Sequence, residues 1–241
     1  MPNVLAYHRP ASLDEAAGLA SGPNAKIIGG GTVAVPAARK PSDEGVEIVD
    51  LQALGLDEVR TDGDRVSLGA MVRLGDLMND ASVPSVLRDL ARRELPSALR
   101  NQATVGGTVA QRDGESVLLA GLLAFDATVD VHGAGTVSLA DYLAQAPAGI
   151  VTAVSVATAG AAAVEGTGRT PADVPIVAAV ARVADGNTTV ALTGVASCPV
   201  LVDPSDPAQG LEPQADFRGS AQYRLHLAKT LTTRAIAAAQ R

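Results

Sequence analysis

The chain has 241 residues, of which 47% are hydrophobic and 19% charged, a composition that excludes disorder and is sufficient for a sizeable core. It carries 19 basic and 26 acidic side chains, a net charge of −7, which opposes binding to nucleic acid or to an anionic membrane. Only 2% of the residues are aromatic, so a site that stacks bases on aromatic rings is nearly excluded.

The single cysteine, Cys198, excludes an internal disulfide and a cysteine-ligated iron–sulfur cluster, which needs about four thiolates. It also fits a reducing compartment. The first residues lack a basic start followed by an apolar core, so no signal peptide is predicted. The longest apolar stretch, residues 117–125, is too short to span a membrane. We therefore expect a cytoplasmic protein.

The first fifty residues predict a small β-α-β-like unit around a glycine sequence. Residues 12–15, Ser-Leu-Asp-Glu, are a capping box that opens a helix to about residue 20. A short apolar strand at 25–28 leads into Gly29-Gly-Gly-Thr32, which we call the first glycine segment. Residues 34–39 are expected to start a helix, and the alternation at 46–49 predicts a second strand.

Two further units follow, and together the three predict an α+β protein. The second contains a glycine turn at Gly106-Gly107, within residues 104–108, Thr-Val-Gly-Gly-Thr, which we call the second glycine segment. In the third, Asp185-Gly-Asn187 predicts a tight hairpin. Strands are predicted at 65–70, 128–131, 136–139, 151–157, 176–183 and 188–192, and helices at 74–78, 83–94, 116–125 and 219–240.

Common catalytic and metal motifs are absent. The three histidines, His8, His132 and His226, are far apart in the sequence and form no ligand-spaced pair. Cys198 precedes a proline in an apolar context and is interpreted as a small buried hydrophobic residue. The sequence contains no Gly-x-Ser-x-Gly, no Walker loop and no Gly-x-Gly-x-x-Gly. We therefore predict no metal site and identify no catalytic residue.

The two glycine segments are the remaining candidates for a binding site. Adjacent glycines let the backbone approach an anion closely and direct N–H groups toward it, and the threonine hydroxyls add donors. Either segment alone is more simply explained as a tight turn. Two of them, one in each of the first two predicted units, suit opposite walls of a pyrophosphate site.

The chain resembles, nearly end to end, the FAD-binding medium subunit of the molybdenum hydroxylases, the family of xanthine and carbon monoxide dehydrogenases. Residues 29–36, Gly-Gly-Gly-Thr-Val-Ala-Val-Pro, are similar to the first flavin loop of that subunit. Residues 99–108, Leu-Arg-Asn-Gln-Ala-Thr-Val-Gly-Gly-Thr, are similar to its second flavin loop. Further similar sequences stand at residues 7–16, 68–77, 122–127 and 220–227.

This resemblance implies a two-subdomain FAD-binding fold of the vanillyl-alcohol-oxidase/PCMH type in residues 1–149, with subdomains at about 1–57 and 58–149. It implies a small C-terminal domain of antiparallel strands and helices at 150–241, expected as three strands and a helix without flavin contact. It also implies that FAD passes electrons between an iron–sulfur subunit and an external acceptor. Substrate hydroxylation would take place at molybdenum in a separate molybdopterin subunit.

The resemblance also implies the residues that hold FAD. Gly29, Gly30, Gly31, Thr32 and Val33 would contribute from the first segment, and Thr104, Gly106, Gly107 and Thr108 from the second. The sequence departs from the family at three of its polar contacts, because Val33 replaces serine or aspartate, Thr108 replaces asparagine, and Val117 replaces an aspartate that holds cofactor hydroxyls. Asp113 and Glu115 are the candidate substitutes for that aspartate. Each lost contact is expected to weaken binding by roughly 0.5–1.5 kcal/mol.

Three functions are consistent with these residues. The favoured one is an FAD-containing electron-transfer subunit with an iron–sulfur and a molybdopterin partner chain. The second is a stand-alone flavoenzyme on the same fold, for which Asp113, Glu115 and Glu165 are the candidate bases. The third is a binding or scaffold protein that has lost its flavin, a reading motivated by Val33 and Val117.

Overall fold

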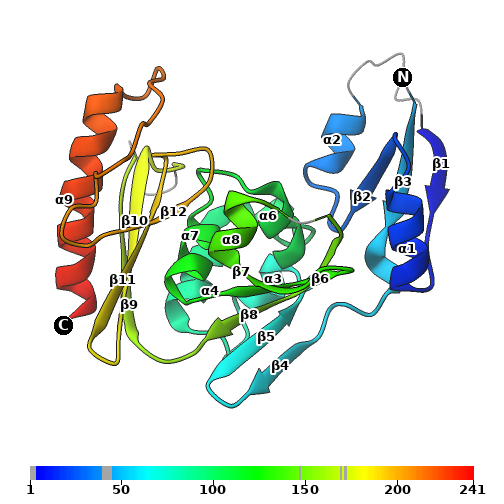
Figure 1. Ribbon diagram of the computed structural model, residues 1–241, viewed down its shortest axis with the longest axis horizontal. Coiled ribbons are helices and arrows are strands. Elements are labelled where there is room, and N and C mark those ends of the chain that lie inside the picture. The colour runs from blue at the N-terminus through cyan, green and yellow to red at the C-terminus, as the bar shows by residue number, and fades with distance from the viewer. Residues whose placement is uncertain (1–3, 40–44, 147, 169, 171–172) are drawn as a thin grey trace.

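The computed structural model describes the whole chain except residues 1–3, 40–44, 147, 169 and 171–172. The described residues form three β-sheets with helices packed on and between them. Figure 1 shows the three units side by side in chain order, with the middle unit between the N-terminal and C-terminal ones. The α+β class predicted from the sequence is confirmed.

The N-terminal unit is a parallel three-stranded sheet with strand order β1-β3-β2 and two short helices. The helix predicted from the capping box is confirmed, because Ser12 Oγ accepts the N–H of Glu15 at 3.2 Å. Strand β1 was not predicted, since its Val4, Leu5 and Tyr7 are exposed and give no core pattern. The elements are β1 (Val4–His8), α1 (Leu13–Ala20), β2 (Ala25–Ile28), α2 (Ala34–Ala38) and β3 (Val46–Asp50), followed by a 3-10 turn, η1 (Leu51–Ala53).

The middle unit is built on an antiparallel five-stranded sheet with strand order β4-β5-β8-β6-β7. Its central strand, β8, was predicted as part of the third unit, and this placement is wrong. Val154 of β8 lies opposite both Leu68 and Val129, and all three side chains are fully buried, so β8 completes the core of the middle sheet. The strands are β4 (Val59–Asp62), β5 (Arg65–Gly69), β6 (Thr128–His132), β7 (Gly135–Ser138) and β8 (Ile150–Ala157).

Six helices accompany this sheet: α3 (Leu74–Leu77), α4 (Ser85–Glu94), α5 (Ser97–Arg100), α6 (Val105–Gln111), α7 (Val117–Ala124) and α8 (Leu139–Ala144). Helix α7 is buried along its whole length. Gly121 allows α4 to pack closely against it, because a Cβ at this position would lie 2.4 Å from Leu90 Cδ1 and 2.9 Å from Leu87 Cδ2.

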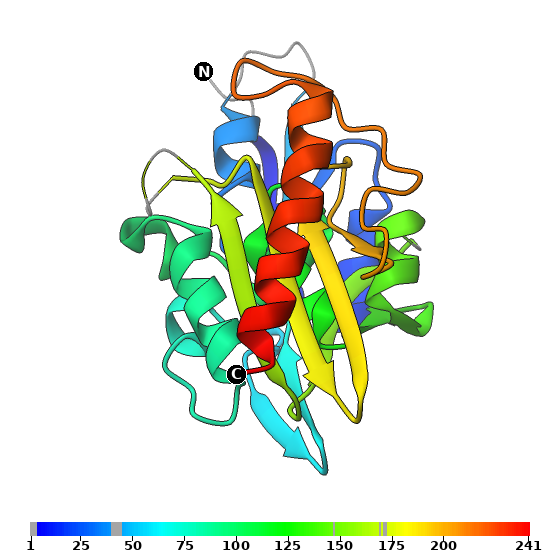
Figure 2. The same cartoon turned by 90° about the vertical axis from the view of Figure 1, so that its left-hand side faces the viewer.

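The C-terminal unit is an antiparallel sheet of β9 (Ala161–Thr167), β10 (Val177–Ala184), β11 (Asn187–Thr193) and β12 (Val200–Val202), with α9 (Ala221–Ala239) lying across it (Figure 2). The expected hairpin is confirmed, since Asp185 and Gly186 have φ of 53° and 76° between β10 and β11. The expectation of three strands is corrected: β8 belongs elsewhere, while β9 and β12 were not predicted.

Helix α7 connects the middle and C-terminal units. Ala178 and Val180 of β10 pack into the core that contains α7, whereas Val177 and Ala179 pack toward α9. The C-terminal sheet is therefore buried on both faces. None of the helices among the described residues is both long and apolar enough to cross a membrane.

Candidate functional site: a cavity between two glycine segments

The first glycine segment is distant in the sequence from the second, but in the structure it lies directly against Thr104 of that segment and against Gln102, just before it. A Cβ on Gly30 would lie 1.7 Å from the carbonyl oxygen of Gln102, and a Cβ on Gly29 would lie 2.9 Å from Thr104 Oγ1. No side chain fits into distances this short, so glycine is required at position 30 for the contact to form.

The first segment connects β2 to α2 and has backbone donors to offer. Gly31 adopts the left-handed conformation, with φ of 73°. The backbone N–H groups of Gly31, Thr32 and Val33 form no hydrogen bond with any other described residue. Successive free N–H groups around a left-handed residue form a concavity that binds anions. The segment therefore has the properties of an anion-binding loop.

The second segment differs from its prediction. Gly106 and Gly107 are not in a turn but in the first turn of α6, because Thr104 caps that helix and its Oγ1 accepts the N–H of Gly107 at 3.1 Å. The N–H of Gly106 donates to Ala70 O at 2.9 Å. Both glycine amides therefore already have partners within the chain. Gly106 is needed for packing, because a Cβ there would lie 2.6 Å from that of Ala70.

Both segments line a cavity of about 330 Å³, which we call the glycine-lined cavity. Much of the remaining surface is apolar and comes from β2, the start of α2, η1, the two residues after β5, the C-terminal end of α4, α8 and the start of β8. The predicted site residues that line it are Gly29, Gly30, Gly31, Thr32, Val33, Thr104, Gly106, Gly107, Thr108 and Asp113. The structure thus brings together ten of the eleven predicted residues.

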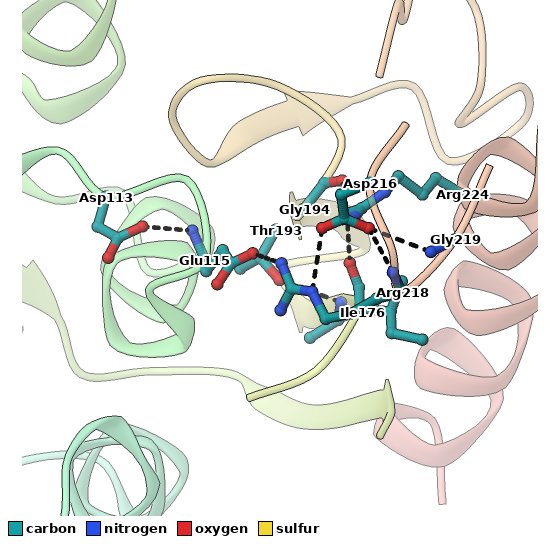
Figure 3. A network of polar contacts seen from close by, with 10 residues as sticks. Asp113, Glu115, Ile176, Thr193, Gly194, Asp216, Arg218, Gly219 and Arg224 are labelled. Atoms are coloured by element: carbon teal, nitrogen blue, oxygen red, sulfur yellow. Dashed lines mark hydrogen bonds and ion pairs between the residues drawn. The ribbon is translucent and has the colours of Figure 1, made fainter. Parts of the chain in front are cut away.

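The eleventh predicted residue, Glu115, does not line the cavity and faces the C-terminal unit. Figure 3 shows its carboxylate paired with Arg218, which also contacts Asp216. Asp216 forms a further ion pair, at 2.8 Å, with the buried Arg224. The hydrogen bond from Arg224 is the main cause of a lowered pKa at Asp216. Val117, where the resemblance expects an aspartate, is 6% exposed and also does not line the cavity.

Several cavity-lining residues were not predicted. Ile150 and Val151 belong to the wall because β8 lies in the middle sheet. The prediction that residues 150–241 make no flavin contact stays a prediction, and these two positions are where it is most open to challenge. Glu94, Ser116 and Tyr142 also line the cavity. Glu94 ends an amphipathic helix and belongs to no motif, so no signal in the sequence distinguished it from a surface residue.

The chemistry of this wall favours binding rather than acid–base or nucleophilic catalysis. Among the described residues that line it there is no histidine, cysteine, lysine or arginine. Its charged groups are the carboxylates of Glu94 and Asp113, and burial raises the pKa of Glu94. Backbone N–H groups and hydroxyls are therefore the donors available to an anionic ligand. In the described part of the chain, no three His, Cys, Asp or Glu side chains gather as a metal site.

Comparisons with known proteins agree with this geometry. Residues 3–158 match the family described as the FAD binding domain in molybdopterin dehydrogenase. The chain is 32% identical over 197 residues to the uncharacterized protein YgfM of Escherichia coli (strain K12), covering 76% of each chain. It is 30% identical over 134 residues to the nicotine 6-hydroxylase medium subunit of Paenarthrobacter nicotinovorans, covering 54% of this chain and 47% of that subunit.

The whole fold also has a solved counterpart. A chain of the carbon monoxide dehydrogenase from Hydrogenophaga pseudoflava superposes with a TM-score of 0.89, covering 100% of this chain and 98% of that one at 22% identity. The fold predicted from the resemblance is thereby confirmed. From the match over residues 3–158, the chain belongs to the family of FAD-binding domains of molybdopterin dehydrogenases and is therefore a flavoprotein of the oxidoreductase class.

Proposed function

We propose that this chain is the electron-transfer subunit of a molybdenum hydroxylase, in which bound FAD receives electrons from an iron–sulfur partner and passes them to an external acceptor. The observation that carries the proposal is the contact of the two glycine segments at one cavity, with Gly30 against Gln102 and the free N–H groups of residues 31–33 beside it.

The residues present fit FAD. The N–H groups of Gly31, Thr32 and Val33 would hold the pyrophosphate, and the apolar wall formed by Leu51 and Ile150 would accept an aromatic ring system. Gly107 keeps the wall of the second segment open, since a Cβ there would have only Thr104 Oγ1 nearby, at 3.0 Å. Bound FAD supplies the redox chemistry, while the chain binds it, orients it and limits its contact with water.

The partners in this proposal follow from what the chain lacks. Its one cysteine is too few for an iron–sulfur cluster, which needs about four ligands. Among the described residues of the cavity wall there is no cysteine, and no histidine or lysine to activate a hydroxyl as a nucleophile. Electrons would therefore come from an iron–sulfur subunit, and hydroxylation would take place in a molybdopterin subunit. The similar nicotine 6-hydroxylase protein is itself described as a medium subunit.

Two alternatives to this function differ in how well the structure supports them. Val33, which is 50% exposed at the cavity, and the buried Val117 both lack the polar group that the family resemblance expects. These two residues favour a protein of this fold that has lost its flavin. A stand-alone flavoenzyme would instead use Asp113 as its base, since Glu115 faces away from the cavity.

Affinity purification of the tagged chain from the organism that encodes it separates these functions. The proposal predicts two co-purifying chains, with iron, molybdenum and about one FAD per copy of this chain. Purification of the chain alone with FAD would favour the stand-alone flavoenzyme. Purification without FAD, and without FAD uptake on titration, would contradict the proposal and favour the scaffold.

A further inference from the structure

Glu94 is the least explained charged group of the glycine-lined cavity. It ends α4, and its Oε2 accepts the N–H of Leu118, in the first turn of α7, at 2.9 Å. The side chain is half-buried and forms no ion pair with a described residue. Burial raises the pKa of Glu94, and the nearby charge of Asp113 adds to the rise, while hydrogen bonds from the Ser116 side chain and from the first turn of α7 only partly oppose it.

The start of α7 does not require this carboxylate. Ser116 already caps the helix, with its Oγ accepting the N–H of Leu119 at 3.0 Å. A neutral cap of this kind is a common and sufficient way to begin a helix. A desolvated carboxylate without a cation is costly, and such groups are concentrated at functional sites. The position of Glu94 in the cavity wall therefore points to a ligand.

The ligand group that suits Glu94 is a hydroxyl. A hydroxyl that donates to a carboxylate forms a strong, charge-assisted hydrogen bond and adds no charge to the cavity. The other carboxylate of the wall, that of Asp113, is less suited because it is exposed and is therefore already solvated by water. The Glu94 carboxylate also lies beside the first turn of α7. This is the turn in which Val117 stands where the family resemblance expects a polar aspartate.

We propose that Glu94 is a binding residue that accepts hydrogen bonds from the hydroxyl groups of FAD, either on its sugar-alcohol chain or on its ribose. This inference rests on the proposed function, because it takes FAD as the ligand of the glycine-lined cavity. It assigns to α4 a contact that the family resemblance leads one to expect at position 117, in α7.

Titration of purified wild type and Glu94→Gln with FAD tests the proposal. Glutamine keeps the length of the side chain and a carbonyl oxygen for the N–H of Leu118, so the start of α7 is preserved. We expect FAD affinity to fall at least about tenfold. The matched control is Glu58→Gln, which removes an exposed carboxylate paired with Arg60 and should leave affinity within about twofold of wild type.

Two partial ligands distinguish the hydroxyl groups. ADP carries the ribose but not the sugar-alcohol chain, and FMN carries the chain but not the ribose. Weaker binding of FAD and FMN with unchanged ADP would place Glu94 at the sugar-alcohol chain, and weaker binding of FAD and ADP with unchanged FMN would place it at the ribose. Either result supports the proposal.

Unchanged FAD affinity in a folded Glu94→Gln protein would overturn this inference and leave the proposed function standing. Absence of FAD binding by the wild type would overturn both. If Glu94→Gln does not fold, Glu94→Asp keeps the charge and withdraws the carboxylate by one methylene. We expect that variant to fold and to bind FAD more weakly, and wild-type affinity would overturn the inference.

Discussion

Gly106 and Gly107 are neighbours in the sequence, but their missing side chains serve different purposes. Gly106 is buried against Ala70, where a Cβ would also lie 2.9 Å from the carbonyl oxygen. Gly107 is exposed at the cavity and has only Thr104 Oγ1 near its Cβ position. One glycine therefore allows the protein to pack, and the other leaves space in the cavity.

This difference predicts opposite outcomes for two substitutions. Gly107→Val should fold with a circular dichroism spectrum like that of the wild type and lose FAD affinity by about 100-fold or more, since its side chain would project into the cavity in which we propose that FAD binds. Gly106→Val should lose about 1–3 kcal/mol of stability through overpacking. Thermal unfolding and FAD titration measure both. Wild-type FAD content in folded Gly107→Val would reject the assignment of the second segment.

The raised pKa of Glu94 predicts a pH-dependent effect on stability without FAD. Burial makes the folded protein bind the proton more tightly than the unfolded chain, so stability falls as pH rises through the raised pKa. Glu94→Gln removes that loss. At pH 7 its melting temperature should exceed that of the wild type, and the difference should shrink at acidic pH. A Glu94→Gln protein less stable than wild type at pH 7 would contradict this.

At the scale of elements, the segment before α9 is held to the loop before α7 by alternating charges. Arg218 contacts both Glu115 and Asp216, and Asp216 also binds Arg224 (Figure 3). Arg224 is only 4% exposed, and it donates to the carbonyl oxygens of Ile176 at 3.0 Å and Gly194 at 2.7 Å. We therefore expect Arg224 to contribute more than Arg218 to the stability of the fold.

We expect Arg224→Ala to lower the free energy of unfolding by about 2–3 kcal/mol, because buried carbonyl oxygens lose a charged donor. Arg218→Ala, whose pairs are more exposed, should cost about 1 kcal/mol or less. Urea denaturation of both variants measures the difference. Since none of these side chains lines the cavity, FAD affinity should stay close to wild type in Arg218→Ala. Equal destabilisation by the two substitutions would contradict the larger contribution of Arg224.

The sequence predicted individual helices and strands better than it predicted which elements they pack or pair with. The capping box at Ser12 and the Asp185-Gly186 hairpin are local signals, and both are confirmed. The placement of β8 could not be predicted, because alternation at 151–157 indicates a strand but not which sheet receives it. Strand β9 was not predicted because small alanine side chains give little hydrophobic contrast. The glycine motifs identified both walls of the cavity, but nothing in them indicated Glu94.

At the scale of the whole molecule, the middle and C-terminal units share one core. Helix α7 packs beneath β10 and β11, with Val180 and Ala191 among its buried neighbours. The family match ends at residue 158, before this sheet begins. The matched region contains every residue that lines the cavity, but its hydrophobic core is completed by residues outside it.

A fragment of residues 1–158 should consequently fail to form a stable fold. Removing the C-terminal sheet exposes the side of α7 that it covers, and α7 has no polar side chain between residues 117 and 124. We expect aggregation, or a compact state without a cooperative thermal transition. The full chain, purified in parallel, is the control. A monomeric fragment that unfolds cooperatively and binds FAD would show that the C-terminal unit is dispensable.

The central claim is that the contact between the two glycine segments forms an FAD site, and titration of the purified full chain with FAD tests it most directly. Isothermal calorimetry or flavin fluorescence would give the stoichiometry and the dissociation constant. The account predicts saturable binding of one FAD per chain, lost in folded Gly107→Val. Absence of saturable binding, or equal binding by that variant, would contradict it.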